Sequence, residues 1–201
     1  MAELTFDPVK HIYRVDGKKL PSVTDIVRPL VTFGDIGLQI IKQAARRGTA
    51  VHEYAELIDY GIDANDLEVE PELVGYVTAY TRFLKDYKPE WELIEKPLYS
   101  LELGYAGTLD RFGIIDCEKA IVDIKTSSNV VRSSRIAWAV QLEAYLKLLD
   151  CGFAKRYNLW LKNDGTYQLI SATKTEEKYG FKARDLFAML LEIKKITGGS
   201  K

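Results

Sequence analysis

The sequence is poor in cysteine and carries almost no net charge. Its 201 residues include only two cysteines, Cys117 and Cys151, which excludes a four-cysteine iron–sulfur cluster or zinc site within one chain. So few cysteines provide no disulfide framework, which favours a reducing compartment. The formal net charge of −1 excludes a surface that is basic overall. Any bound nucleic acid would need positive charge gathered locally, in a groove.

Long apolar runs are also absent. No run reaches the roughly 20 residues that a membrane-spanning helix needs, and Glu3, Asp7 and Lys10 do not fit a signal peptide. We therefore expect no membrane association and a cytoplasmic location. The hydrophobic content of 47% is enough for a packed core, and 201 residues suit one domain.

The most informative stretch lies in the middle of the chain and predicts two strands joined by a turn. The first strand covers Tyr105–Ile115, the polar segment Asp116–Lys119 forms the turn, and the β-branched run Ala120–Ile124 forms the second strand. Asp123 interrupts the second run, and Lys125 follows two places later. Because side chains alternate along a strand, these two residues share one face.

A buried carboxylate or ammonium is costly unless it is paired or bound to a metal. If the two strands pair as a hairpin, Asp110 comes close to Asp123. Two carboxylates beside Lys125 would form a site for a divalent cation and a phosphate. The alternative is an ordinary ion pair between Asp123 and Lys125 at a strand edge, and the two motifs alone do not decide between them.

The rest of the pattern predicts an α/β fold. Asp16 and Gly17 mark the turn of an early hairpin, and Ser22 with Asp25 forms a capping box at the start of a helix. Ser133 or Ser134 caps a later helix. The predicted elements are the hairpin His11–Leu20, helices over Asp35–Tyr60 and Pro71–Tyr87, a strand Trp91–Leu98, a helix Arg135–Leu149, strands Ala154–Leu161 and Tyr167–Ala172, and a last helix Thr175–Ile196.

Asp110, followed 13 residues later (123 − 110 = 13) by Asp123-Ile124-Lys125, resembles the motif of the PD-(D/E)XK nuclease superfamily. The predicted order helix-strand-strand-strand-helix-strand is the core order (αβββαβ) of the restriction-endonuclease-like fold, independently of the motif residues. The resemblance implies a mixed central sheet flanked by helices, with an N-terminal hairpin and helical extension. We expect one domain, with residues 1–34 as that extension, 35–172 as the nuclease core and 173–201 as a C-terminal helix.

Two further segments resemble the RecB-type branch of this superfamily. Gly48-Thr-Ala-Val-His52-Glu53 lies on a predicted helix, and in that branch the histidine is a metal ligand. The branch includes the mitochondrial genome-maintenance exonuclease and the CRISPR adaptation nucleases. Pro21-Ser-Val-Thr24 is similar to the mitochondrial exonuclease and its phage relatives. The ordinary alternatives are a core or surface histidine and a well-capped helix.

Gln141 and Tyr145 lie four residues apart on one helix face and match the Q-x-x-x-Y motif of the same branch. In relatives these residues line the site and contact the DNA strand; the alternative is a core tyrosine beside a half-exposed glutamine. Glu95 matches a glutamate that many relatives have, with a role in a second metal, a water-mediated contact or support. Its alternative is a pair with Lys96 or with another surface charge.

The resemblance implies a metal-dependent deoxyribonuclease, an exonuclease acting on single-stranded or end-containing DNA in replication, recombination or repair. It implies Mg²⁺ or Mn²⁺ and no iron–sulfur cluster, because the cysteine cluster of some relatives is absent. A phage-encoded chain would act in the host cytoplasm, with replication or recombination proteins as partners. The alternative is a catalytically inactive nucleic-acid-binding or inhibitory module on the same fold.

The residues that the resemblance assigns fall into three groups. The expected metal ligands are His52, Asp110, Asp123 and the carbonyl of Ile124, and the expected catalytic residues are Asp110, Asp123, Lys125 and Glu95. The candidate DNA contacts are Gln141, Tyr145, Thr126, Ser127, Arg132 and Arg135, with Arg46 and Arg47 as further candidates for phosphate contacts.

Overall fold

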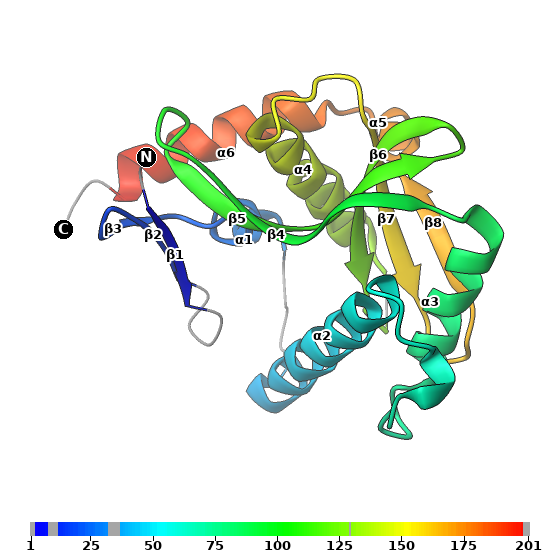
Figure 1. The fold of residues 1–201 in the computed structure, drawn as a ribbon. Helices are drawn as coiled ribbons and strands as arrows, with labels where there is room; N and C mark the ends of the chain where they lie inside the picture. Colours follow the sequence, from blue (N-terminus) through cyan, green and yellow to red (C-terminus); the bar gives the residue numbers. More distant parts are fainter. Residues whose placement is uncertain (1–2, 8–11, 32–36, 129, 199–201) are drawn as a thin grey trace.

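The computed structural model describes residues 3–7, 12–31, 37–128 and 130–198. It is a mixed α/β structure, with a five-stranded sheet flanked by helices and a separate three-stranded sheet near the N-terminus (Figure 1). The predicted α/β class with a mixed, helix-flanked sheet is therefore confirmed. The strands of the large sheet are β4 (Glu90–Ser100), β5 (Tyr105–Ile115), β6 (Glu118–Lys125), β7 (Lys155–Leu161) and β8 (Tyr167–Ser171).

The five strands lie in sequence order across the large sheet. Three of the four strand pairs are antiparallel, and only β6 and β7 run parallel. A parallel pair needs a crossover connection, and α4 (Arg132–Leu148) provides it. The polar end of β6 therefore leads directly into the segment before α4.

Two apolar clusters bury the faces of this sheet. The first includes buried residues of α1 (Val23–Val27), α4 and α6 (Ala183–Gly198), with Tyr105 of β5 packed edge-on against Phe187. The second includes residues of α2 (Leu38–Asp59), α3 (Val74–Tyr87) and the apolar side of β6. No helix among the described segments is both long and apolar enough to cross a membrane.

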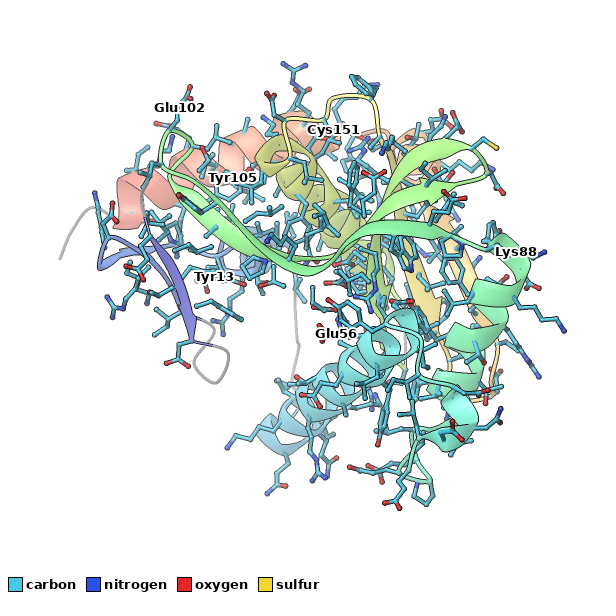
Figure 2. The ribbon with its side chains drawn as sticks, in the orientation of Figure 1. Tyr13, Glu56, Lys88, Glu102, Tyr105 and Cys151 are labelled. Atoms are coloured by element: carbon cyan, nitrogen blue, oxygen red, sulfur yellow. The ribbon has the colours of Figure 1, made fainter. Side chains whose placement is uncertain are left out.

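The N-terminal sheet consists of β1 (Leu4–Asp7), β2 (Ile12–Val15) and β3 (Lys18–Leu20). Tyr13, labelled in Figure 2, is buried and shares a hydrogen bond of 2.8 Å with the hydroxyl of Thr108 in β5. The predicted turn at Asp16-Gly17 is present. Short 3₁₀ turns occur at Arg28–Leu30 and Ala64–Asp66.

The predicted capping box of α1 is also present, because Ser22 accepts from the backbone of Asp25 and the Asp25 carboxylate accepts in return. The expected starts at His11 and Asp35 lie outside the described residues, as does the predicted boundary between residues 34 and 35. The proposed division of the chain into three segments stays a prediction.

The central hairpin has the predicted first strand and a tighter turn. Only Asp116 and Cys117 form the turn, with φ of 49° and 63°, and β6 already begins at Glu118. Two-residue hairpin turns require positive φ at both positions because that twist matches the twist of the strands. The predicted four-residue turn is therefore shortened.

Three other predicted boundaries are wrong. The crossover helix begins at Arg132, and its N-cap Val131 makes no side-chain capping bond, so neither Ser133 nor Ser134 caps it. The third helix begins at Val74, because the residues from Pro71 onwards form turns instead. The last predicted helix is two helices, α5 (Ala172–Tyr179) and α6.

The break between α5 and α6 has a local cause. Gly180 adopts a left-handed conformation with φ of 66° and ends α5. The Glu176 carboxylate then accepts from the backbone of Ala183 at 2.7 Å, at the start of α6. Strand β8 stops at Ser171 because the Ser171 hydroxyl caps α5.

The alternation of side chains breaks in the middle of the β4–β5 pair. Leu109 and Phe112 are three residues apart, yet both belong to the first apolar cluster, which strict alternation would forbid. Opposite them, Leu93 and Leu98 both pack on that cluster although they are five apart. Between these two, Glu95 has a positive φ of 43°. The irregularity changes the direction of the neighbouring side chains, as bulges near active sites do.

Candidate functional site

Polar side chains form a row across the large sheet. In β4 and β5, Ile94 pairs with Arg111 and Lys96 with Leu109, so Glu95 lies opposite Asp110 between these two pairs. The register of β5 and β6, continued by one step, places Asp110 opposite Asp123. In the parallel pair, Asp123 lies beside Asn158. Three carboxylates from three adjacent strands therefore converge, as the sequence predicted for Asp110 and Asp123.

His52 of α2 completes this arrangement. Its Nδ1 lies 3.1 Å from Oε1 of Glu95 and 3.7 Å from Oδ2 of Asp110. Its Nε2 lies 3.3 Å from the carbonyl oxygen of Ile124. The ligand atoms of His52, Glu95 and Asp110 all lie within 4.8 Å of one another. One imidazole and two carboxylates at this separation are a suitable donor set for a divalent cation, with the nitrogen favouring Mn²⁺ over Mg²⁺.

Asp123 stands beside this group and not within it. Its Oδ2 accepts from Asn158 Nδ2 at 2.9 Å and pairs with Lys125 Nζ at 2.6 Å. The backbone N–H of Ile124 donates to Oδ2 of Asp110 at 2.7 Å. The geometry thus brings Glu95 into the group of ligand atoms, and the expected role of Asp123 as a ligand stays a prediction.

The charges of the site act against one another. Burial raises the pKa of Asp110 to about 7, and the carboxylates of Asp123 and Glu95 act in the same direction. Burial lowers the pKa of His52, but Asp110 and Glu95 outweigh it and raise that pKa to about 9. Burial raises the pKa of Glu95, yet the cations of His52 and Arg111 hold it below its usual value. A divalent cation would offset this crowding of negative charge, so the residues fit one.

The site opens into a cavity of about 520 Å³. Its walls come from β1, α1, α2, the strands β4 to β6 and α4. In Figure 1 the β4–β5 hairpin passes above α2 and the N-terminal sheet, and Figure 2 labels Glu56 at the end of α2 beneath that hairpin. Thr24, from the segment that resembles the mitochondrial exonuclease, also lines the cavity.

Lys125, Gln141 and Tyr145 form the wall on the side of α4. Lys125 Nζ donates to Oε1 of Gln141 at 3.0 Å, and Gln141 Nε2 donates to the hydroxyl of Tyr145 at 3.5 Å. The ammonium of Lys125 also lies 6.0 Å from the ring centre of Trp138. The two halves of the predicted Q-x-x-x-Y motif therefore lie in the same cavity as the carboxylates.

The other candidate DNA contacts lie outside the cavity walls. The guanidinium of Arg132 lies over the ring of Tyr179 at 5.0 Å, and Arg135 is half-buried on the same helix. Thr126 is buried, and the carbonyl of Ser127 accepts from the indole of a tryptophan in β7.

Arg46 and Arg47 do not line the cavity that contains His52, Glu95 and Asp110. Arg46 pairs with Glu70 at 3.5 Å, and Arg47 lies over the ring of Tyr76 at 5.7 Å. Both arginines line a separate cavity between α2 and α3. Contacts of these two residues with phosphate stay a prediction, and they would require a strand that passes over the outer face of α2.

Sequence reasoning missed three polar residues that support the site. Arg111 is fully buried and donates to Asp59 Oδ2 at 2.5 Å and to Glu95 Oε1 at 2.8 Å. Because the Glu95 carboxylate contacts His52 and Arg111, the alternative that Glu95 pairs with Lys96 on the surface is wrong. Asn158 donates to Asp123, as described above. An arginine inside an otherwise apolar strand was the visible signal.

The backbone of Glu95 is strained. A non-glycine residue with φ of 43° is unfavourable by about 1–3 kcal/mol, and such residues persist only where the surroundings hold them. The contacts of its carboxylate with His52 and Arg111 keep the backbone in this conformation. Strain of this kind concentrates at functional sites.

Comparisons with protein-family models and with curated proteins found no match.

Proposed function

We propose that this protein is a metal-dependent nuclease that hydrolyses phosphodiester bonds, built on a restriction-endonuclease-like core of the RecB-type branch. The observation that carries the proposal is the convergence of ligand atoms from His52, Glu95 and Asp110 within 4.8 Å, beside the Asp123–Lys125 ion pair. The order α3-β4-β5-β6-α4-β7 supports the core assignment, because it matches the αβββαβ order.

In this proposal His52, Glu95 and Asp110 would hold Mg²⁺ or Mn²⁺, with Asp123 and the carbonyl of Ile124 adjacent. Such an ion would polarise a phosphate oxygen and lower the pKa of a bound water. Asp123 contributes negative charge and holds Lys125 close to the site. The ammonium of Lys125 then stabilises the negative charge that grows on the phosphate during attack.

The substrate side of the proposal rests on the wall formed by α4. Gln141 offers an amide and Tyr145 a phenol to a strand in the cavity. The chain contains no helicase motif, so we propose DNA that is single-stranded or presents ends. Replication or recombination partners and a cytoplasmic location belong to the same proposal.

Cleavage of DNA by the purified protein tests the proposal. Linear single strands labelled at either end, duplexes and closed circles are incubated with Mg²⁺, Mn²⁺ or EDTA. We expect metal-dependent cleavage of linear single strands that is lost in Asp110→Asn. Glu177→Gln, the same kind of change at an exposed carboxylate of α5, should cleave like the parent.

Two outcomes would contradict parts of this proposal. Binding of DNA without cleavage of any DNA or RNA form, with either metal, would favour an inactive binding module. Faster cleavage of closed circles than of linear single strands would leave a nuclease but remove the preference for ends.

A further inference from the structure

A buried network links the candidate ligands to the far end of α2. Arg111 is at its centre, with no exposed surface. Its Nη1 donates to Oε1 of Glu95 at 2.8 Å and to the backbone carbonyl of Asp110 at 2.7 Å. Its Nε donates to Oδ2 of Asp59 at 2.5 Å. One guanidinium therefore contacts two of the three residues that supply the candidate ligand atoms.

Asp59 is itself held from two further elements. The hydroxyl of Tyr80 in α3 donates to its Oδ2 at 2.6 Å, and the indole N–H of Trp91 in β4 donates to its Oδ1 at 3.2 Å. The Asp59 side chain is 1% exposed. A carboxylate with three donors in the interior has one preferred position, and it fixes the guanidinium of Arg111 in turn.

Helix α2 connects the two ends of this network, because it carries both His52 and Asp59. His52 and Asp59 are seven residues apart on α2, about two helical turns, so both point to the hairpin from one helix face. His52 contacts Glu95, and Asp59 contacts Arg111. Two residues of α2 therefore contact two residues of the β4–β5 pair.

The position of the Glu95 carboxylate depends on its contacts with His52 and Arg111. The backbone of Glu95 has a positive φ, so it lacks the extended conformation that sets the direction of a side chain in a strand. Its Oε1 lies within hydrogen-bond distance of both Arg111 Nη1 and His52 Nδ1. Arg111 also keeps one buried nitrogen, Nη2, with no partner among the described residues, so the arrangement does not maximise the hydrogen bonds of the arginine itself.

We propose that Arg111 is a positioning residue for the metal site, which holds the carboxylate of Glu95 and the backbone of Asp110 where both present oxygen to the cation. This inference rests on the proposed metal-dependent function. Arg111 does not touch the ion or the substrate. Its planar fork reaches three acceptors from two separate nitrogens, Nε and Nη1, and the single nitrogen of a lysine cannot span these positions.

Arg111→Lys tests the inference, because it keeps the charge and removes the fork. Calorimetric titration with Mn²⁺, well below the melting temperature of each protein, should show a dissociation constant raised about 10–100-fold, the usual range for residues that support metal ligands. Cleavage at saturating Mn²⁺ should return close to the parental rate. A rise in the metal requirement with little loss of the maximal rate separates positioning from catalysis.

Arg156→Lys is the matched control. Arg156 also bridges two carboxylates, Glu143 and Glu176, at 2.7 Å each, and it lines a different cavity. It should lose stability and keep the parental Mn²⁺ affinity. Asp59→Asn provides a second variant should Arg111→Lys fail to fold, since it loosens Arg111 without contacting a candidate ligand. It should weaken Mn²⁺ binding in the same direction.

The outcomes separate the two proposals. A parent protein that binds no Mn²⁺ overturns the proposed function. A parent that binds Mn²⁺ while Arg111→Lys or Asp59→Asn binds it equally well overturns the positioning role alone. A metal-free crystal structure of Arg111→Lys in which Glu95 still contacts His52 overturns that role as well, independently of any metal measurement.

Discussion

Replacing Glu95 by glycine should leave a more stable protein than replacing it by alanine. In an ordinary strand the order is reversed, because glycine is about 0.5–1 kcal/mol less favourable than alanine. At φ of 43° a residue with a Cβ is disfavoured by roughly 1–2 kcal/mol. The two terms together leave Glu95→Gly about 1 kcal/mol more stable than Glu95→Ala. Both variants lose the same carboxylate and leave Arg111 with the same missing partner, so those losses cancel in the comparison.

Urea unfolding of both variants measures this difference. For a chain of 201 residues, 1 kcal/mol corresponds to about 2–4 °C in melting temperature, which thermal unfolding resolves. Gln168, an exposed residue of β8 outside the positions with positive φ, provides the control pair. At this position Gln168→Ala should be more stable than Gln168→Gly. Equal or greater stability of Glu95→Ala over Glu95→Gly would refute the strained backbone at the site.

Three more outcomes are expected. Lys125→Ala should bind Mn²⁺ at least as well as the parent, because it removes local positive charge, while single-turnover cleavage falls by ~10²–10³; near-parental cleavage would reduce the lysine to an ion-pair partner. Gly107→Ala should destabilise the protein by about 1–3 kcal/mol, because its Cβ would lie 2.8 Å from the Tyr145 ring, whereas Gly152→Ala, with nothing within 4 Å, should be neutral in urea unfolding. The stability difference between the metal-free parent and Asp110→Asn should fall as pH rises from about 4 to about 7, because native Asp110 keeps a proton, up to a pKa of about 7, that the unfolded chain has lost. A difference that rises with pH in denaturant titrations would contradict the burial of a protonated carboxyl.

The sequence was informative where one local rule decided the structure. A β-branched run next to a polar turn predicted the β5–β6 hairpin, and pairing then brought Asp110 to Asp123. The four-residue spacing of Gln141 and Tyr145 placed both on one face of α4. These inferences needed only the periods of strands and helices.

The part that could not be predicted depends on a break in those periods. The resemblance pointed to Glu95, but the position of its carboxylate depends on a backbone that leaves the strand conformation, and no residue type in that segment indicates a positive φ. Arg111 and Asp59 are 52 residues apart, and only the packing of α2 on the hairpin brings them together. The division of the last helix was within reach, because Gly180 is a common helix-ending residue.

The position of α6 also bears on how the chain folds during synthesis. Val23 of α1 and Leu190 of α6 belong to one buried cluster, so that cluster cannot close until the ribosome has added α6. The second cluster draws its buried residues from Val51 to Leu161 and can form earlier. Contacts between residues so distant in sequence slow folding. The nascent chain should therefore complete the α2–α3 side first and remain open on the α4 side, where Lys125, Gln141 and Tyr145 meet, until α6 packs in place.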